Sequence, residues 1–159
     1  MYNTSCIWQY SGAGGVFMKV REVMTNQVIP IASTESVEVA ARTLAQYNIG
    51  SLPVMENGKL CGLVTDRDLV TRCMAAGKQP GKTSVREVMS TGLACAQPDM
   101  EVGVAAHLMG RCRVRRLPVM ENGTLCGMVS LGDLAKREDS IMDAADALGD
   151  ISGNVSRGY

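Results

Sequence analysis

The stretch LPVMENGKLCGLVTDRDL, residues 52–69, returns later in the chain as LPVMENGTLCGMVSLGDL, residues 117–134. Extending this comparison outward at a constant offset of 65 positions aligns Val20–Arg72 with Val85–Arg137 without a gap, and about 23 of the 53 pairs are identical. The pentapeptide VREVM opens both copies. The chain therefore contains two tandem copies of one supersecondary unit.

Each copy has the pattern strand, helix, strand, strand, helix. A short apolar run at Val28–Ile31 precedes side chains at helical spacing, and Asn-Gly steps at 57–58 and 122–123 favour tight hairpin turns between the next two strands. Asp99 is the expected N-cap of the first helix in the second copy. The last helices are expected from Asp66 towards Ala76 and from Leu131 towards Arg137. The first-helix stripes are Val37, Ala40, Ala41, Leu44 and Tyr47, and Val102, Ala105, Ala106, Met109 and Cys112.

These elements predict an α+β fold, of α/β-type repeats, in which two β-α-β-β-α units pack sheet to sheet. One copy alone, about 55 residues, would leave one sheet face uncovered and be marginally stable. The expected divisions are an N-terminal appendage that is poorly ordered, a first repeat, a linker, a second repeat, and a C-terminal helix and tail, at residues 1–17, 18–76, 77–84, 85–138 and 139–159. The terminal helix is expected to pack on the module or on a partner through Ile141, Ala144, Ala145 and Leu148, and residues 153–159 to be loose.

Composition excludes several classes of function. Lys and Arg number 16 and so do Asp and Glu, so no overall field attracts nucleic acid. The six cysteines show no metal-ligand spacing, so we expect no metal site and reduced core thiols in a cytoplasmic protein. No apolar run approaches the length of about 18 residues that spans a membrane. The single histidine, His107, is expected at a surface or interface.

The motifs VREVM, LPVMENG, GLVTDRDL and GMVSLGDL, in this order and in tandem, resemble the CBS-domain family over residues 19–137. The resemblance implies that the two repeats form a disc-like Bateman module with pseudo-twofold symmetry and two clefts. Such modules often dimerise, and they bind AMP, ADP, ATP, S-adenosylmethionine or related ligands. They have no catalytic residues, and this chain likewise lacks a second histidine and a complete Walker or Rossmann signature.

The candidate ligand site is the string Gly62-x-x-Thr65-x-x-Asp68 and its repeat Gly127-x-x-Ser130-x-x-Asp133, where a strand gives way to a helix. A carboxylate can accept hydrogen bonds from both ribose hydroxyls, and a glycine permits close approach of the backbone. The resemblance assigns ribose to the two aspartates, and ribose or phosphate to the two hydroxyls. The same residues also match a capping box, which would explain them without a ligand.

The segment before Leu-Pro distinguishes the two copies. The second copy has four arginines in six residues, Arg111 to Arg116, where the first has Asn48-Ile49-Gly50-Ser51. Guanidinium groups suit phosphate oxygens, and the resemblance selects Arg115 and Arg116, with Arg67 as a further candidate. The alternative is a solvated basic strand end. The residues expected to form an adenine slot, each of which could instead be simple core, are Ile29, Ile31, Ile49, Gly50 and Val114.

The expected function is that of a regulatory adenosine-nucleotide-binding module without catalytic activity, with AMP, ADP or ATP as its regulatory ligand rather than a catalytic cofactor. It would signal through a homodimer or a separate effector protein. The alternative is a structural module for dimerisation or partner docking whose clefts hold no ligand.

Overall fold

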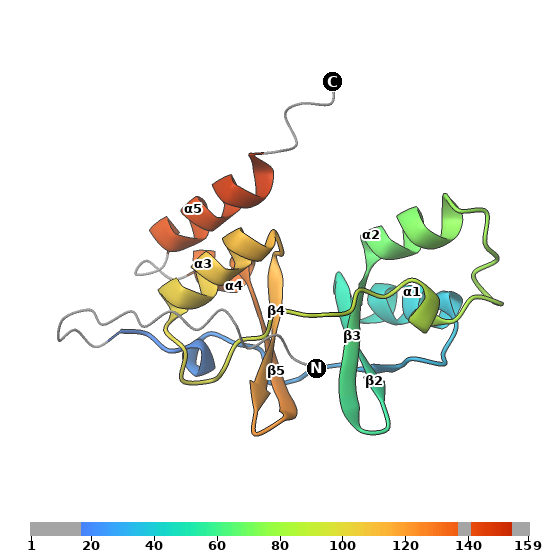
Figure 1. Cartoon of the computed structure of the whole chain (residues 1–159), viewed down its shortest axis with the longest axis horizontal. Helices are drawn as coiled ribbons and strands as arrows, with labels where there is room; N and C mark the ends of the chain where they lie inside the picture. The colour runs from blue at the N-terminus through green and yellow to red at the C-terminus, as the bar shows by residue number, and fades with distance from the viewer. Residues whose placement is uncertain (1–16, 137–140, 154–159) are drawn as a thin grey trace. The chain divides into compact units, whose positions relative to one another are not determined.

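The computed structural model describes residues 17–136 and 141–153. The chain forms two compact units (Figure 1). The first unit is Val28–Leu93, and the second unit combines the described parts of Met1–Gln27 and Ala94–Tyr159. The expectations of a poorly ordered N-terminal appendage and a loose C-terminal tail fall almost wholly on residues 1–16 and 154–159, which lie outside the described residues.

The order of elements largely follows the predicted repeat, and the fold class is α+β as expected. The elements that build the first unit are β1 (Ile31–Ala32), α1 (Val37–Tyr47), β2 (Ser51–Glu56), β3 (Lys59–Thr65), α2 (Asp66–Asp68), the π-helical turn η2 (Leu69–Met74) and the 3-10 turn η3 (Val85–Glu87). Those of the second unit are the 3-10 turn η1 (Val20–Glu22), α3 (Val102–Cys112), β4 (Arg116–Glu121), β5 (Thr124–Ser130), α4 (Leu131–Ala135) and α5 (Ile141–Ser152).

Each unit is built around an antiparallel hairpin. In the first unit β2 pairs with β3 and, in parallel, with β1, giving the predicted three strands. In the second unit β4 pairs with β5, and the expected first strand is reduced to a single parallel bridge between Ala96 and Val119. The hairpin turns have the predicted left-handed conformation, with φ of 50° at Asn57 and 74° at Gly58. Asparagine and glycine adopt this conformation at the least steric cost.

The long helix of each unit begins and ends by local chemistry. Ser36 caps α1 by accepting a hydrogen bond from the amide of Val39 at 3.2 Å, and α1 ends at Asn48 in the left-handed conformation. The predicted cap of α3 is wrong, because the N-cap residue is Glu101. Asp99 instead lies 2.7 Å from the guanidinium of Arg21. This ion pair holds the loop before α3 against η1.

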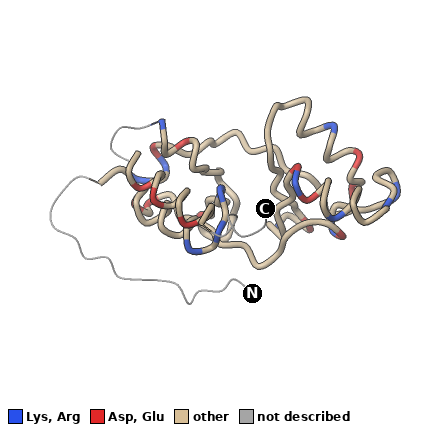
Figure 2. Tube along the Cα trace, turned by 90° about the horizontal axis from the view of Figure 1, so that it is seen from above, with Lys and Arg blue, Asp and Glu red and all other residues tan. Residues whose placement is uncertain are grey.

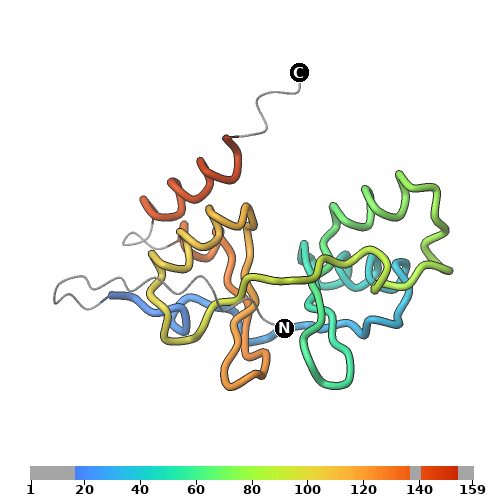
Figure 3. Tube along the Cα trace, viewed as in Figure 1, coloured from blue at the N-terminus to red at the C-terminus, as the bar shows by residue number. Residues whose placement is uncertain are grey.

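The VREVM segments are exchanged between the sequence repeats. Val20, from the start of the first repeat, is fully buried in the core of the second unit, and Val85 and Val88, from the start of the second repeat, are fully buried in the core of the first. Figure 3 shows residues 17–27 running with the second unit and residues 77–90 with the first. Each compact unit therefore contains the opening pentapeptide of one repeat and the body of the other.

The C-terminal helix packs through a different face from the predicted one. The buried residues of α5 are Ala144 and Ala147, and Ile151 is half-buried against the same core. Ile141 and Leu148 are each 46% exposed, so they do not pack on this chain, and their contact with a partner stays a prediction. Helix α5 lies against α3 and α4 (Figure 1).

Candidate ligand-binding site

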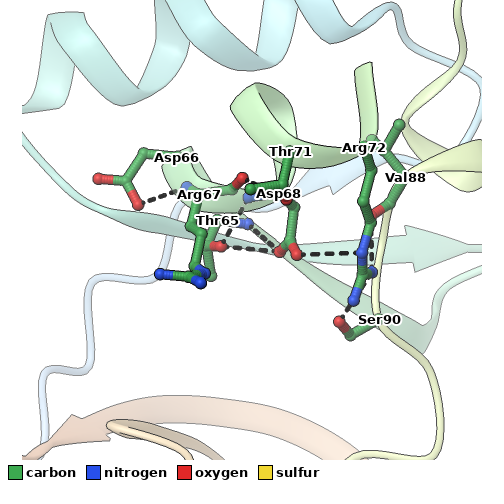
Figure 4. A network of polar contacts seen from close by, with 8 residues as sticks. All are labelled: Thr65, Asp66, Arg67, Asp68, Thr71, Arg72, Val88 and Ser90. Atoms are coloured by element: carbon green, nitrogen blue, oxygen red, sulfur yellow. Dashed lines mark hydrogen bonds and ion pairs between the residues drawn. The ribbon is translucent and has the colours of Figure 1, made fainter. Parts of the chain in front are cut away.

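The predicted pair Thr65 and Asp68 meets at the junction of β3 and α2. The amide of Thr65 donates to Asp68 Oδ2 at 2.9 Å, and the Thr65 hydroxyl donates to the same oxygen at 2.7 Å (Figure 4). The amide of Asp68 in turn donates to Thr65 Oγ1 at 3.2 Å. These reciprocal bonds form a capping box, which is the structural alternative drawn from the sequence.

The second repeat has the same arrangement. The amide and hydroxyl of Ser130 donate to Asp133 Oδ2 at 2.9 and 2.6 Å, and the amide of Asp133 donates to Ser130 Oγ at 3.2 Å. In both boxes one carboxylate oxygen, Oδ2, accepts the two capping bonds. A role of either aspartate in binding a ligand therefore depends on its second oxygen, Oδ1.

The environment of Oδ1 differs between the two described sites. Asp68 Oδ1 lies 3.5 Å from Arg72 Nε, and the Asp68 side chain is only 12% exposed. Arg72 also donates to the carbonyl of Val88 at 2.9 Å and to Ser90 Oγ at 3.1 Å, which ties the Asp68 carboxylate to the segment after η3 (Figure 4). Asp133 Oδ1 has Lys136 Nζ at 3.9 Å, and its side chain is 23% exposed.

Sequence reasoning missed the role of Arg72. Its signal was present, because Arg72 follows Asp68 by four residues and opposite charges at that spacing meet on one helix face. The further bonds to Val88 and Ser90 could not be predicted, since they depend on the exchange of the VREVM segments.

The residue that begins each hairpin lies beside the capping box. Arg116 of β4 is the direct partner of Ser130 in β5, and Ser51 is the partner of Thr65. Directly opposed residues of an antiparallel pair project from the same face, with Cβ atoms about 5 Å apart. The arginine of the second unit therefore starts next to the hydroxyl and carboxylate of its capping box, where the first unit has a serine.

Backbone hydrogen bonds also join the residue before each hairpin to the start of the helix that follows the hairpin. The amide of Leu131 donates to the carbonyl of Arg115 at 3.0 Å, and the amide of Asp66 donates to that of Gly50 at 3.3 Å. Arg115 is exposed and Arg116 is half-buried. Of the predicted site residues, the structure thus brings together Ser130, Asp133, Arg115 and Arg116 in the second unit, and Thr65, Asp68 and Gly50 in the first.

The adenine-slot candidates fall into different environments. Ile31 is 6% exposed and belongs to the hydrophobic core of the first unit. Ile29 is half-buried against that core, and Val114 is half-buried against the core of the second unit. Ile49 is 37% exposed. Arg67 is exposed, and its carbonyl accepts a hydrogen bond from the Thr71 hydroxyl at 2.8 Å.

Both motif glycines lie in close contact with the exchanged segments. A Cβ on Gly62 would lie 2.5 Å from Met89 Sδ and 2.9 Å from the carbonyl oxygen of Ser90. A Cβ on Gly127 would lie 2.9 Å from Met24 Sδ. The close approach that these glycines permit is therefore an approach of the protein's own chain.

The environment of the cysteines determines how reactive their thiols are. Burial raises the pKa of the Cys95 thiol, and Cys61 and Cys126 are shifted in the same direction for the same first cause. Cys112 is exposed, so the expectation that every cysteine is a core thiol is wrong for this residue.

Within residues 17–136 and 141–153, no cluster of three His, Cys, Asp or Glu side chains could hold a metal ion. Both signs of charge are interspersed in each unit (Figure 2).

No helix in the part of the chain that the structure describes combines the length and apolar character needed to cross a membrane.

The family model, the curated relatives and the solved structures that match this chain agree with one another. A family model described as CBS domain matches residues 20–75 and 85–140. The CBS domain-containing protein YhcV of Bacillus subtilis is 41% identical over 133 residues, covering 84% of this chain and 94% of YhcV. The crystal structure of the CBS domain NE2398 matches with a TM-score of 0.70 and 32% identity, covering 76% of this chain and 96% of that chain. The hexameric CBS-CP12 protein from bloom-forming cyanobacteria matches with a TM-score of 0.71 and 25% identity, covering 90% and 92%.

Proposed function

This chain belongs to the CBS-domain family, and from that premise we propose that it is a non-catalytic regulatory module whose second unit binds an adenosine nucleotide. CBS-domain pairs are generally regulatory and often bind ligands. The ligand proposed here is AMP, ADP or ATP, and the signal passes to a second copy of the chain or to a separate effector protein.

The observation that carries this proposal is the pairing of Arg116 with Ser130 beside Asp133. This pairing gives one site both a carboxylate and a cationic fork on the same face of the hairpin. Asp133 Oδ1 is free of the capping bonds and partly exposed, so it can accept a hydrogen bond from a ribose hydroxyl. The Arg116 and Arg115 guanidinium groups would bind the phosphates, since their planar forks match phosphate oxygens.

The first unit is a poorer site on the same criteria. Its carboxylate contacts Thr65 through one oxygen and Arg72 through the other, and Ser51 stands where the second unit has an arginine. A ligand at Asp68 would have to displace Arg72, which also bonds Val88 and Ser90. We therefore expect nucleotide affinity to reside mainly in the second unit.

The alternative function is a structural module for dimerisation or partner docking. The capping boxes favour it, because each aspartate already has a role in its own backbone. The two functions make opposite predictions, since a nucleotide that binds only the folded state raises the unfolding temperature and a purely structural module is unaffected.

Isothermal titration calorimetry with ATP tests the proposal. Asp133→Ala should weaken binding at least tenfold, equivalent to about 1.4 kcal/mol, because charged hydrogen bonds to ribose are lost. Asp68→Ala is the matched control, since it removes the same cap in the other unit, and it should change affinity less. Equal losses in the two variants, or none in either, would contradict the assignment.

A reciprocal exchange tests the phosphate site. Arg116→Ser gives the second unit the residue of the first, and it should weaken ATP binding more than adenosine binding. Ser51→Arg gives the first unit the residue of the second and should add affinity there. If adenosine and ATP lose affinity equally in Arg116→Ser, Arg116 does not bind phosphate.

A further inference from the structure

Helix α5 lies against α3 across two glycines. A Cβ on Gly103 would lie 3.1 Å from Asp143 Oδ2, and a Cβ on Gly110 would lie 2.9 Å from Asp150 Oδ2 and 3.3 Å from the Cα of Ala147. The two backbones therefore approach closely at Gly110, and the Asp143 and Asp150 carboxylates lie on the surface of α3. The seven-residue step from Gly103 to Gly110 corresponds to about 10 Å along the helix axis.

The three acidic residues of α5 lie together along this contact. Asp143, Asp146 and Asp150 line a shallow hollow with Gly103 and His107. The spacing of three and then four residues puts the aspartates on one face of the helix. The sequence of α5 contains no lysine or arginine, so its negative charge has no counter-charge within the helix.

The end of this contact adjoins the segment Arg111–Arg116, here called the arginine loop. The amide of Arg113 donates to the carbonyl of Gly110 at 3.1 Å, and the amide of Val114 donates to that of Met109 at 3.0 Å. Gly110, which Asp150 covers, is thus in the turn of α3 that directly positions the loop. Arg113 is the helix C-cap, with a left-handed φ of 54°.

The backbone at the end of α3 and the arginine loop act on the Asp150 carboxylate in opposite directions. The C-terminal end of a helix carries partial negative charge from its unpaired carbonyl groups, so a carboxylate beside the end of α3 is repelled by the backbone. The arginine loop supplies the opposing positive charge within the same turn. A phosphate bound by the arginine loop would therefore compete with the α5 carboxylates for the same positive potential.

We infer that α5 is an autoinhibitory acidic arm for the nucleotide site of the second unit. In its docked position Asp150, and to a lesser degree Asp146, reduces the positive potential at the arginine loop and lowers the affinity for phosphorylated ligands. By reciprocal linkage, a bound nucleotide weakens the docking of α5 by the same factor. The apolar part of the contact is small, because α5 buries only Ala144 and Ala147 fully and Ile151 partly. The inference rests on the nucleotide site proposed above.

The electrostatic effect should fall with distance from the loop. The screening length is about 8–10 Å at physiological salt, close to the 10 Å that separates the two ends of the contact. Asp150→Asn should therefore tighten ATP binding roughly two- to fivefold at physiological salt, and by less at high salt. Asp143→Asn removes the same charge from the same helix at the far end, and it should change the affinity by a smaller factor. Adenosine, which has no phosphate, should respond to neither variant.

The experiment measures ATP and adenosine affinity by calorimetry for the full chain and both variants. Tighter ATP binding in Asp150→Asn than in Asp143→Asn supports the inference. This comparison holds even when the wild type binds ATP too weakly to measure. If the wild type binds ATP and the two variants do not differ, the acidic arm is refuted while the nucleotide site stands. If neither the wild type nor any variant binds ATP, both proposals are refuted.

Hydrogen exchange supplies a second readout. ATP should accelerate amide exchange in residues 141–152 relative to adenosine, because the nucleotide weakens the docking of α5. Exchange that ATP slows, or leaves unchanged, in a chain that binds ATP would overturn the proposed sign of the coupling.

Discussion

Replacing Gly62 by alanine tests the exchange of the VREVM segments. The new Cβ would lie 2.5 Å from Met89 Sδ and 2.9 Å from the carbonyl oxygen of Ser90. The methionine can move, but the carbonyl cannot do so easily, because Leu63 donates to it at 3.0 Å and the amide of Ser90 donates back to the Leu63 carbonyl at 2.8 Å. Overpacking of this kind costs about 1–3 kcal/mol, and the fixed backbone places Gly62→Ala near the upper end.

The assay is urea and thermal unfolding, with two further glycines as controls. A loss of about 2–3 kcal/mol should lower the midpoint temperature by roughly 4–12 °C for a chain of this length. Gly127→Ala should cost less, since its Cβ would lie 2.9 Å from Met24 Sδ and 3.1 Å from the Thr25 oxygen. Gly149→Ala, within α5 with nothing inside 4 Å of its Cβ, should stabilise the helix by up to about 1 kcal/mol. Equal stability of Gly62→Ala and wild type would refute the close contact.

Two further predictions concern side chains. Arg86→Ala should destabilise the first unit by about 0.5–1.5 kcal/mol, because it breaks an ion pair with Glu56 and a hydrogen bond to the buried Ser33 hydroxyl. The loss should shrink at high salt in urea unfolding, and a salt-independent loss would contradict the ion pair. Iodoacetamide at neutral pH should label Cys112 before Cys95, as read by peptide mass spectrometry, because Cys112 is exposed whereas burial raises the pKa of Cys95 and leaves less of its reactive thiolate. Labelling of Cys95 should accelerate at alkaline pH, and equal rates of the two cysteines at neutral pH would refute this assignment.

Local patterns determined most of the fold. The hairpins followed from Asn57-Gly58 and its repeat, because few other residue pairs accept two consecutive left-handed conformations. The first long helix followed from the spacing of Val37, Ala40 and Leu44, which are buried as a period of 3.6 residues requires. The start of α3 was wrong by two residues, since Asp99 pairs with an arginine that is distant in sequence.

Long-range relations were not predictable from either copy alone. The two repeats align without a gap, and nothing in that alignment shows that VREVM of one repeat packs into the core of the other unit. The same limit applied to the candidate site. Sequence could name Asp68 and Asp133 as equivalents, but the contact of Asp68 with Arg72, and of Arg72 with Val88, emerges only from the packed unit.

The two copies differ in the sequence of their first long helix. Helix α1 has Glu38 and Arg42, which form an ion pair, at positions where α3 has Gly103 and His107. Glycine within a helix costs about 1 kcal/mol relative to alanine, so two glycines in α3 require a compensating contact. The close approach of α5 to Gly103 and Gly110 supplies it.

Helix α3 leads directly into the arginine loop. The first copy has neither the two helix glycines nor the four arginines. Alanines at these two positions would favour the isolated helix, so the glycines serve the close contact with α5. The proposed anion site, opposed by α5, would account for the four arginines that follow this helix. A variant with Gly103→Ala and Gly110→Ala should displace α5 and raise ATP affinity, whereas unchanged α5 protection in hydrogen exchange would contradict this account of the glycines.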